Sequence, residues 1–335
     1  MSTASSEDHP HAAHAATVQD TGEFGVISRI TAGRRQPDST LLGPGDDAAL
    51  VAVSGGVVVA SVDMLIEGRH FRIDWSSPHD IGRKAVAQNA ADLVAMGASP
   101  VTFLVALGCP PNTGIAFTDA LNEGLWEEAA CVGAGISGGD LVQAPGVTLS
   151  VTALGDLHGR RAVLRSGARP GDVVALAGAT GYSVAGYTLL SRGVTARTAA
   201  AAECLSVHRA PRPPYSVGLA AASLATAMID TSDGLVSDLG HIAAASGVRI
   251  SIDSRALGSP EPVQEVAALC GASAADWVLD GGEDHAFAGT FPPGEQLPVG
   301  WRLIGHVDTA ADTGPGVVVD GEPRRPGGWT SWKAP

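Results

Sequence analysis

Strands and helices are expected to follow one another irregularly along this chain, and that irregularity restricts the folds open to it. The clearest helix begins at Ser77, a side chain suited to capping, which precedes Pro78 at the first helical position; it should run to Met96 and stop at Gly97. Other strands are expected at 101–107, 147–155, 173–177 and 248–252, and other helices at 118–132, 182–191, 216–226 and 262–269. Because no strict βαβ rhythm emerges, the pattern favours an α+β fold over a doubly wound sheet.

Several shorter features are also expected. The segment from Glu23 reads as a short amphipathic helix, and residues 229–235 read as strand, turn and helix. Two apolar runs, 48–53 and 56–62, flank Ser-Gly-Gly and predict a β-hairpin. Residues 137–140 (SGGD) predict a glycine-rich turn, and an alanine-rich stretch that ends at Ala202 predicts a mobile segment.

The length of the chain, 335 residues, exceeds what one hydrophobic core usually organises and predicts two domains. Residues 1–20 are small, polar and aperiodic and should form a disordered tail. We expect an N-terminal domain over 21–160 that binds metal and nucleotide and forms a dimer contact, and a C-terminal α+β domain over 161–335. A polar connector at 165–172 marks the change from one to the other.

The charge balance argues against a nucleic-acid partner. There are 21 basic and 35 acidic residues, a net charge of −14, and the only lysines are Lys84 and Lys333. Such a surface repels phosphate backbones. A site for small phosphate compounds on so acidic a protein needs positive charge from outside the chain, and divalent cations held by carboxylates are the natural source.

Cysteine usage and hydropathy bear on location. The four cysteines are far apart and form no zinc-type pattern, and no apolar run is long enough to span a bilayer. The N-terminus lacks a basic segment followed by an apolar run. We therefore expect no membrane partner and a cytoplasmic protein with reduced thiols.

Aspartates fall at turns and strand ends throughout the chain, where side chains from distant segments converge readily. They are Asp46, Asp47, Asp63, Asp140, Asp230, Asp233 and Asp284. A single aspartate of this kind commonly bonds its own turn. As a set they fit Mg²⁺, which takes about six oxygen ligands and usually shares them with water and phosphate.

Asp92 differs from these because it interrupts a mostly apolar helix and shares a face with Asn89. A carboxylate packed on such a helix is costly unless it is paired or bound to metal. A helix-side ion pair is the alternative. The chain has neither a GxxxxGK[ST] loop nor GxGxxG after a strand, which argues against a P-loop or a dinucleotide fold.

Taken together, the motifs resemble those of the thiamine-monophosphate kinase family, in order and at similar spacing from about Gly22 onward. They are GDDAA at 45–49, SVDML at 61–65 with His70-Phe71, NAADLVAMGA at 89–98, GGD at 138–140, RSG at 165–167, IDTSDGL at 229–235 and GGED at 281–284. The resemblance implies ATP-dependent phosphorylation of thiamine monophosphate to thiamine diphosphate, with several Mg²⁺ ions. It also implies a homodimer whose N-terminal sheets join across the interface.

The resemblance also assigns roles, position by position. As Mg²⁺ ligands it implies Asp47, Ser61, Val62, Asp63, Asp92, Asp140, Asp230 and, for a further ion, Asp233. As catalytic residues it implies Asp63, Asp92, Asp230 and Arg165. As ATP contacts it implies Gly139, Asp140, Arg165 and Ser232, and as contacts to thiamine monophosphate it implies His70, Glu283 and Trp329. Val62 departs from the family's threonine, which leaves only its carbonyl oxygen as a ligand.

Each of these assignments has a structural alternative. His70 could be a core histidine, Arg165 an exposed ion-pair partner, Glu283 a turn carboxylate beside a structural Asp284, and Trp329 or Trp332 an aromatic that packs the C-terminal segment. At the level of function, the alternatives are another superfamily enzyme such as aminoimidazole ribonucleotide synthetase, or a non-catalytic regulator that binds metal and nucleotide.

Overall fold

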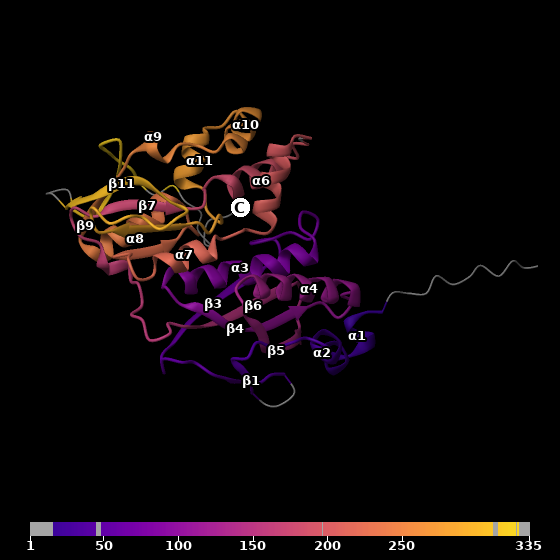
Figure 1. Ribbon diagram of the computed structural model, residues 1–335. Helices are drawn as coiled ribbons and strands as arrows, with labels where there is room; N and C mark the ends of the chain where they lie inside the picture. The colour runs from indigo at the N-terminus through magenta and orange to yellow at the C-terminus, as the bar shows by residue number, and fades with distance from the viewer. Residues whose placement is uncertain (1–15, 45–47, 196, 311–313, 326, 328–335) are drawn as a thin grey trace, which may run out of the picture.

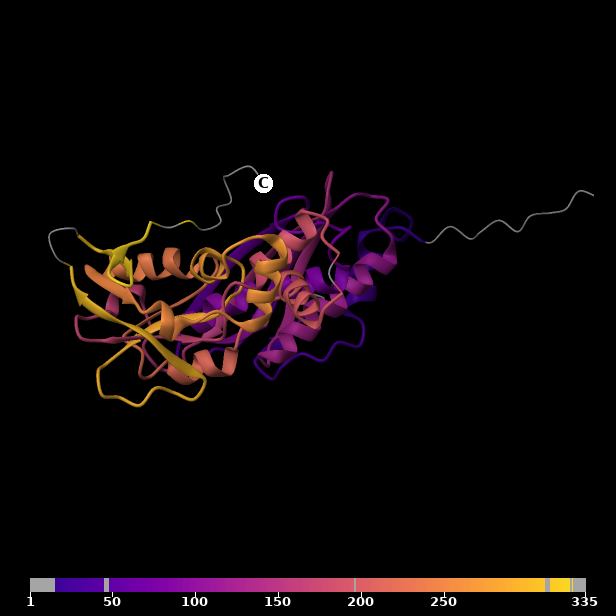
Figure 2. The same ribbon diagram turned by 90° about the horizontal axis from the view of Figure 1, so that it is seen from above.

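The computed structural model describes residues 16–44, 48–195, 197–310, 314–325 and 327. Within them it forms two α/β domains, so the predicted α+β class is confirmed (Figure 1). In the view from above, the N-terminal and C-terminal halves lie toward opposite ends of the molecule (Figure 2). Among the described helices, none has the length and apolar character needed to cross a membrane.

The N-terminal domain is built on a four-stranded mixed sheet in the order β3-β6-β4-β5. β3 and β4 run antiparallel to β6, whereas β4 and β5 are parallel. A separate two-stranded sheet joins β1 and β2. The elements are α1 (Val18–Thr21), α2 (Glu23–Thr31), β1 (Thr40–Leu42), β2 (Leu50–Val51), β3 (Val58–Ile66), α3 (Pro78–Ala95), β4 (Ser99–Cys109), α4 (Ile115–Cys131), β5 (Gly135–Gln143) and β6 (Thr148–Asp156).

The C-terminal domain is built on a seven-stranded sheet in the order β13-β12-β9-β11-β7-β10-β8, in which only the β12–β9 pair is parallel. The short helix η1 (Arg165–Gly167) leads into it. The elements are β7 (Val173–Ala177), α5 (Tyr182–Ser191), α6 (Ala199–Arg209), α7 (Tyr215–Ala221), β8 (Ala227–Asp230), α8 (Leu235–Ser246), β9 (Val248–Ile252), α9 (Ser254–Leu257), α10 (Glu261–Cys270), α11 (Ala274–Asp280), β10 (Phe287–Phe291), β11 (Trp301–Thr309), β12 (Gly316–Val319) and β13 (Glu322–Pro323).

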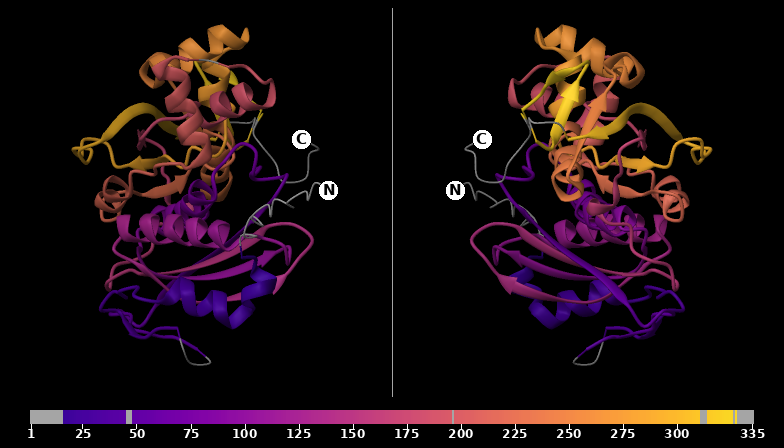
Figure 3. Two further views of the ribbon diagram at one scale, coloured as in Figure 1. Left: turned by 90° about the vertical axis from the view of Figure 1, so that its right-hand side faces the viewer. Right: turned by 90° about the vertical axis from the view of Figure 1, so that its left-hand side faces the viewer.

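Helix α3 lies between the two sheets and joins the domains (Figures 1 and 3). One side packs into the N-terminal core through Ile81, Val86 and Leu93. The opposite side packs through Ala91 and Val94 against the C-terminal sheet. Nearly every side of α3 is buried, and Lys84 and Asn89 are buried along with its apolar residues, which explains why the sequence of α3 lacks an amphipathic stripe. Ser77 accepts a hydrogen bond from the Asp80 backbone, as the predicted N-cap requires.

Four local predictions need correction. The predicted hairpin at 48–62 is wrong, because β2 pairs with β1 while β3 pairs with β6. The Ser54 backbone and hydroxyl both donate to Asp156 at 2.7 Å, which ties the turn to the end of β6. The alanine-rich stretch is helical from Ala199, capped by Thr198, and the end of the expected tail forms α1. The composition of these two segments did not indicate either helix.

The predicted glycine-rich turn at 137–140 is also wrong, since these residues lie inside strand β5. Gly139 pairs with Val105 of β4, next to an irregularity in the register of the two strands. A Cβ atom at position 139 would lie 1.9 Å from the carbonyl oxygen of Val105. Glycine is therefore required here for the close approach of two strands, a different reason from the conformational freedom that a turn demands.

Candidate active site

Strand β3 presents Ser61 and Asp63 on the face of the sheet that packs against α3. Alternation along the strand buries Val59 and Leu65 on this same face, while Val62 points to the other side and is 60% exposed. The backbone N–H of Asp63 donates to Asn89 of α3 at 3.1 Å. The Ser61 hydroxyl donates to Asp92 at 2.6 Å, so Asp92 and Asn89 both face the strand, as their spacing on one helix face predicts.

The C-terminal domain adds Asp230 to these carboxylates. It ends strand β8, is 3% exposed, and lies close enough to Asp63 and Asp92 that its charge affects both. Burial raises the pKa of Asp63, and burial together with the charges of Asp230 and Asp63 raises the pKa of Asp92 to about 7. Asp63, Asp92 and Asp230, from two domains, are thus near enough for their negative charges to repel one another.

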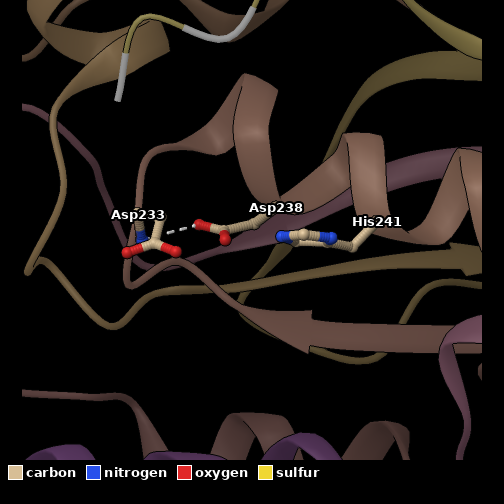
Figure 4. A group of neighbouring side chains, drawn as sticks. All are labelled: Asp233, Asp238 and His241. Carbon is tan, nitrogen blue, oxygen red and sulfur yellow. Dashed lines mark hydrogen bonds between the residues drawn. The ribbon is translucent and has the colours of Figure 1, made fainter. Parts of the chain in front are cut away.

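Asp233 follows in the turn after β8, and burial with the charge of Asp230 raises its pKa. Figure 4 shows Asp233 beside Asp238 and His241 of α8, whose ligand atoms lie within 4.8 Å of one another. Asp238 accepts hydrogen bonds from the backbones of Asp233 and Gly234 at 3.1 and 3.0 Å. Asp238 therefore fixes the turn that carries Asp233. Arg165 is exposed, and its charge reaches Asp233.

A second cluster, next to the carboxylates, joins α3 to the GGED turn at 281–284. The Lys84 ammonium, 3% exposed, lies 3.0 Å from one carboxylate oxygen of Glu283, and His208 lies 3.6 Å from the other. The backbone N–H of Glu283 donates to the carbonyl of Ser232, and the charges of Glu283 and Asp63 both act on His70. His70 and Glu283, the predicted substrate contacts, thus lie in one neighbourhood.

Asp284 takes a different role from its neighbour. It is buried and accepts hydrogen bonds from the backbones of Gly181 and Ser183 at 2.6 and 2.8 Å, at the start of α5. Burial raises its pKa to about 7. The structural role that the sequence suggested for Asp284 is confirmed.

The structure does not bring Gly139 and Asp140 to the carboxylates within one chain. They lie on β5, separated from β3 by two strands. Strand registers align Asp140 with Ala106, Ser150 and Met64, which places its side chain on the face of the sheet opposite Asp63. Asp46, Asp47, Trp329 and Trp332 lie outside the described residues.

Three members of the site were not predicted from the sequence. His285, 6% exposed, comes directly after GGED and lies 2.9 Å from Asp230. Lys84 is one of the two lysines of the chain, and so rare a residue inside a predicted helix was a usable signal. Nothing in the sequence pattern marked His208.

Comparisons with known proteins agree with this arrangement. Residues 45–157 match the AIR synthase related protein N-terminal domain, and residues 169–281 match the AIR synthase related protein C-terminal domain. The thiamine-monophosphate kinase of Mycobacterium tuberculosis is 50% identical over 330 residues, covering 98% of this chain and 96% of the relative. The enzyme of that name from Corynebacterium glutamicum is 41% identical over 87% of each chain.

Solved structures give the same result. Thiamine-monophosphate kinase from Stenotrophomonas maltophilia superposes with a TM-score of 0.78 at 32% identity, covering 89% of this chain and 96% of that one. The structure described as AaThiL complexed with AMPPCP and TMP superposes with a TM-score of 0.77 at 29% identity, covering 94% and 99%. This chain therefore belongs to the thiamine-monophosphate kinase family.

Proposed function

We propose that this enzyme transfers the γ-phosphoryl group of ATP to the phosphate of thiamine monophosphate, forming thiamine diphosphate and ADP. The observation that carries the proposal is the meeting of Ser61, Asp63 and Asp92 with Asp230, across the boundary between two domains. Repelling carboxylates are stable together when a cation lies among them, and phosphoryl transfer depends on such a cation. The reaction consumes ATP, and we place it in the cytoplasm.

Several Mg²⁺ ions fit the residues at this site. The donors are oxygens, which Mg²⁺ prefers, and burial together with the charge of Asp230 raises the pKa of both Asp63 and Asp92. The Thr231 hydroxyl, buried beside Asp230, has no hydrogen-bond partner among the described residues. The proposed ligands are Asp47, Ser61, Val62 through its carbonyl, Asp63, Asp92, Asp140, Asp230 and Asp233. Bound Mg²⁺ would neutralise the two phosphate groups as they approach.

The remaining residues orient the two substrates. The acceptor oxygen of a phosphate monoester is already ionised, so the reaction requires no general base. We assign His70, Glu283 and Trp329 to thiamine monophosphate, and Gly139, Asp140, Arg165 and Ser232 to ATP. Glu283 sits in a left-handed backbone conformation with φ of 63° and is paired with Lys84, so its carboxylate is held in place before substrate binds.

We further propose that two copies associate through the outward face of the four-stranded sheet. On β3 this face carries Val58, Val62, Met64 and Ile66, which are 46%, 60%, 52% and 42% exposed. A row of apolar side chains on an edge strand is typical of an interface. Asp140 lies on the same face, so its assignment to the nucleotide site depends on how the second copy covers it.

The function is tested by measuring ADP and thiamine diphosphate production from ATP, Mg²⁺ and thiamine monophosphate. We expect one thiamine diphosphate per ADP, and no ADP when the acceptor is thiamine or the ribonucleotide substrate of aminoimidazole ribonucleotide synthetase. ATP turnover with the latter and none with thiamine monophosphate would favour the aminoimidazole ribonucleotide synthetase reaction. Binding of nucleotide and metal without turnover of any acceptor would favour a regulator.

A further inference from the structure

His285 is the nearest basic side chain to Asp230 and is held there by the backbone. It lies two residues before strand β10, and its φ of 53° is in the left-handed region. Its N–H donates to the Thr231 carbonyl at 3.0 Å, and the Thr231 N–H donates to the Ala286 carbonyl at 2.8 Å. These two bonds tie the segment that carries His285 to the segment that carries Asp230, so the relative position of the two side chains is fixed.

The imidazole makes a directed contact with that carboxylate. Nδ1 of His285 lies 2.9 Å from Oδ2 of Asp230, and the side chains are 7% and 4% exposed. An ionised carboxylate only accepts hydrogen bonds, so the proton is on Nδ1 and His285 is the donor. Within the described part of the chain, no other hydrogen bond to the side chain of Asp230 competes with this one. The second oxygen, Oδ1, is left available to a metal ion.

We propose that His285 is a positioning residue that, by donating from Nδ1 to Oδ2, holds the Asp230 carboxylate in the orientation required for metal binding. The inference rests on the proposed function to the extent that Asp230 is a Mg²⁺ ligand. The charged groups that act around His285 and Asp230 are Asp63, Asp92, Asp233, Asp238, Glu283 and Asp284. Without the donor, Asp230 is free to rotate away from these like charges, and part of the metal site is lost.

Three substitutions separate positioning from a merely structural role. Asparagine carries an amide N–H close to the place of Nδ1 and tolerates a left-handed backbone, so His285→Asn keeps the donor. Glutamine places its amide further out, near Nε2, so His285→Gln keeps polarity and removes the donor from Asp230. His285→Leu removes the hydrogen bond altogether. Circular dichroism and thermal unfolding establish that each variant is folded.

The measurement is Mn²⁺ binding in the presence of AMPPCP, followed by the electron paramagnetic resonance signal of free Mn²⁺. Loss of a residue that orients a metal ligand typically weakens metal binding about 10- to 100-fold. We expect that loss for His285→Gln and His285→Leu, and affinity within about 3-fold of wild type for His285→Asn. In kinetic assays the Mg²⁺ requirement should rise in parallel, while KM for thiamine monophosphate changes less than 2-fold, about the scatter of such measurements.

Wild-type Mn²⁺ affinity in folded His285→Gln would overturn the inference, and so would equal loss in the asparagine and glutamine variants. If His285→Leu fails to fold, the Mn²⁺ affinities of His285→Asn and His285→Gln still test the inference. The binding assay contains no thiamine monophosphate. A dependence on residue 285 without turnover of that acceptor would therefore refute the proposed function and leave this inference standing.

Discussion

Replacing Asp92 by asparagine should stabilise the metal-free protein while it destroys the metal site. Burial and the charges of Asp230 and Asp63 raise the pKa of Asp92 from 3.8 to about 7. A carboxyl group whose pKa is higher in the folded state binds protons more tightly there, so ionising it at higher pH destabilises the fold. The difference corresponds to about 4 kcal/mol once the pH exceeds 7. Asparagine is of the same size, and its oxygen can still accept from Ser61.

The pH dependence makes this prediction specific. At pH 8 in EDTA, we expect Asp92→Asn to raise the free energy of unfolding by about 2 to 4 kcal/mol. At pH 5 the folded wild-type group is protonated while the unfolded one is largely ionised, and the gain should fall below about 2 kcal/mol. Urea unfolding monitored by fluorescence at the two pH values measures both quantities.

The control is Asp38→Asn, a substitution at an exposed aspartate ahead of β1, which should change stability by less than about 0.5 kcal/mol at either pH. Adding Mg²⁺ and AMPPCP should stabilise wild type more than Asp92→Asn, because the variant lacks a ligand. Equal stability of wild type and Asp92→Asn at pH 8 without metal would refute the claim that these carboxylates repel one another.

Other substitutions test separate parts of the site. Asp63→Asn should lower kcat by at least about 100-fold and leave the circular dichroism spectrum unchanged. Wild-type turnover in this variant would show that Asp63 is not a metal ligand. Lys84→Met leaves the Glu283 carboxylate, which is only 22% exposed, without its ion-pair partner. We therefore expect the free energy of unfolding in urea to fall by about 2 to 4 kcal/mol and KM for thiamine monophosphate to rise. An unchanged KM would show that Glu283 does not contact the substrate. Met64→Glu should convert a dimer to monomers, as measured by the molar mass in light scattering. A molar mass equal to that of wild type would show that β3 does not form the interface.

Local sequence patterns were sufficient for elements whose boundaries are set within a few residues. The cap at Ser77 and the strand 173–177 were placed correctly because capping and apolar periodicity act over one or two turns. The carboxylates at Asp92 and Asp230 were also recognisable from sequence, since an acidic residue inside a packed helix or at the end of a buried strand needs a partner. Asp63 was recognised as well, but its predicted place at a strand end is wrong, because it lies inside β3.

Strand pairing had to come from the tertiary structure. The hairpin at 48–62 failed because β3 gains more from pairing with β6 and packing on α3 than from a local turn, and such long-range contacts leave no mark in a short window. The same limit concealed the role of Gly139, whose missing side chain makes room for Val105 on a neighbouring strand.

The sequence by itself determined which residues could bind metal and phosphate, because that depends on side-chain chemistry and on the order of the motifs. Only the folded chain decided which of them meet. It brought Asp230 near enough to Asp92 for their charges to interact across two domains, paired Lys84 with Glu283, placed His285 beside Asp230, and turned Asp140 to the opposite face of its sheet. The first two relations depend on how α3 packs between two sheets, and the last two depend on strand pairing; both arise from contacts between distant parts of the chain.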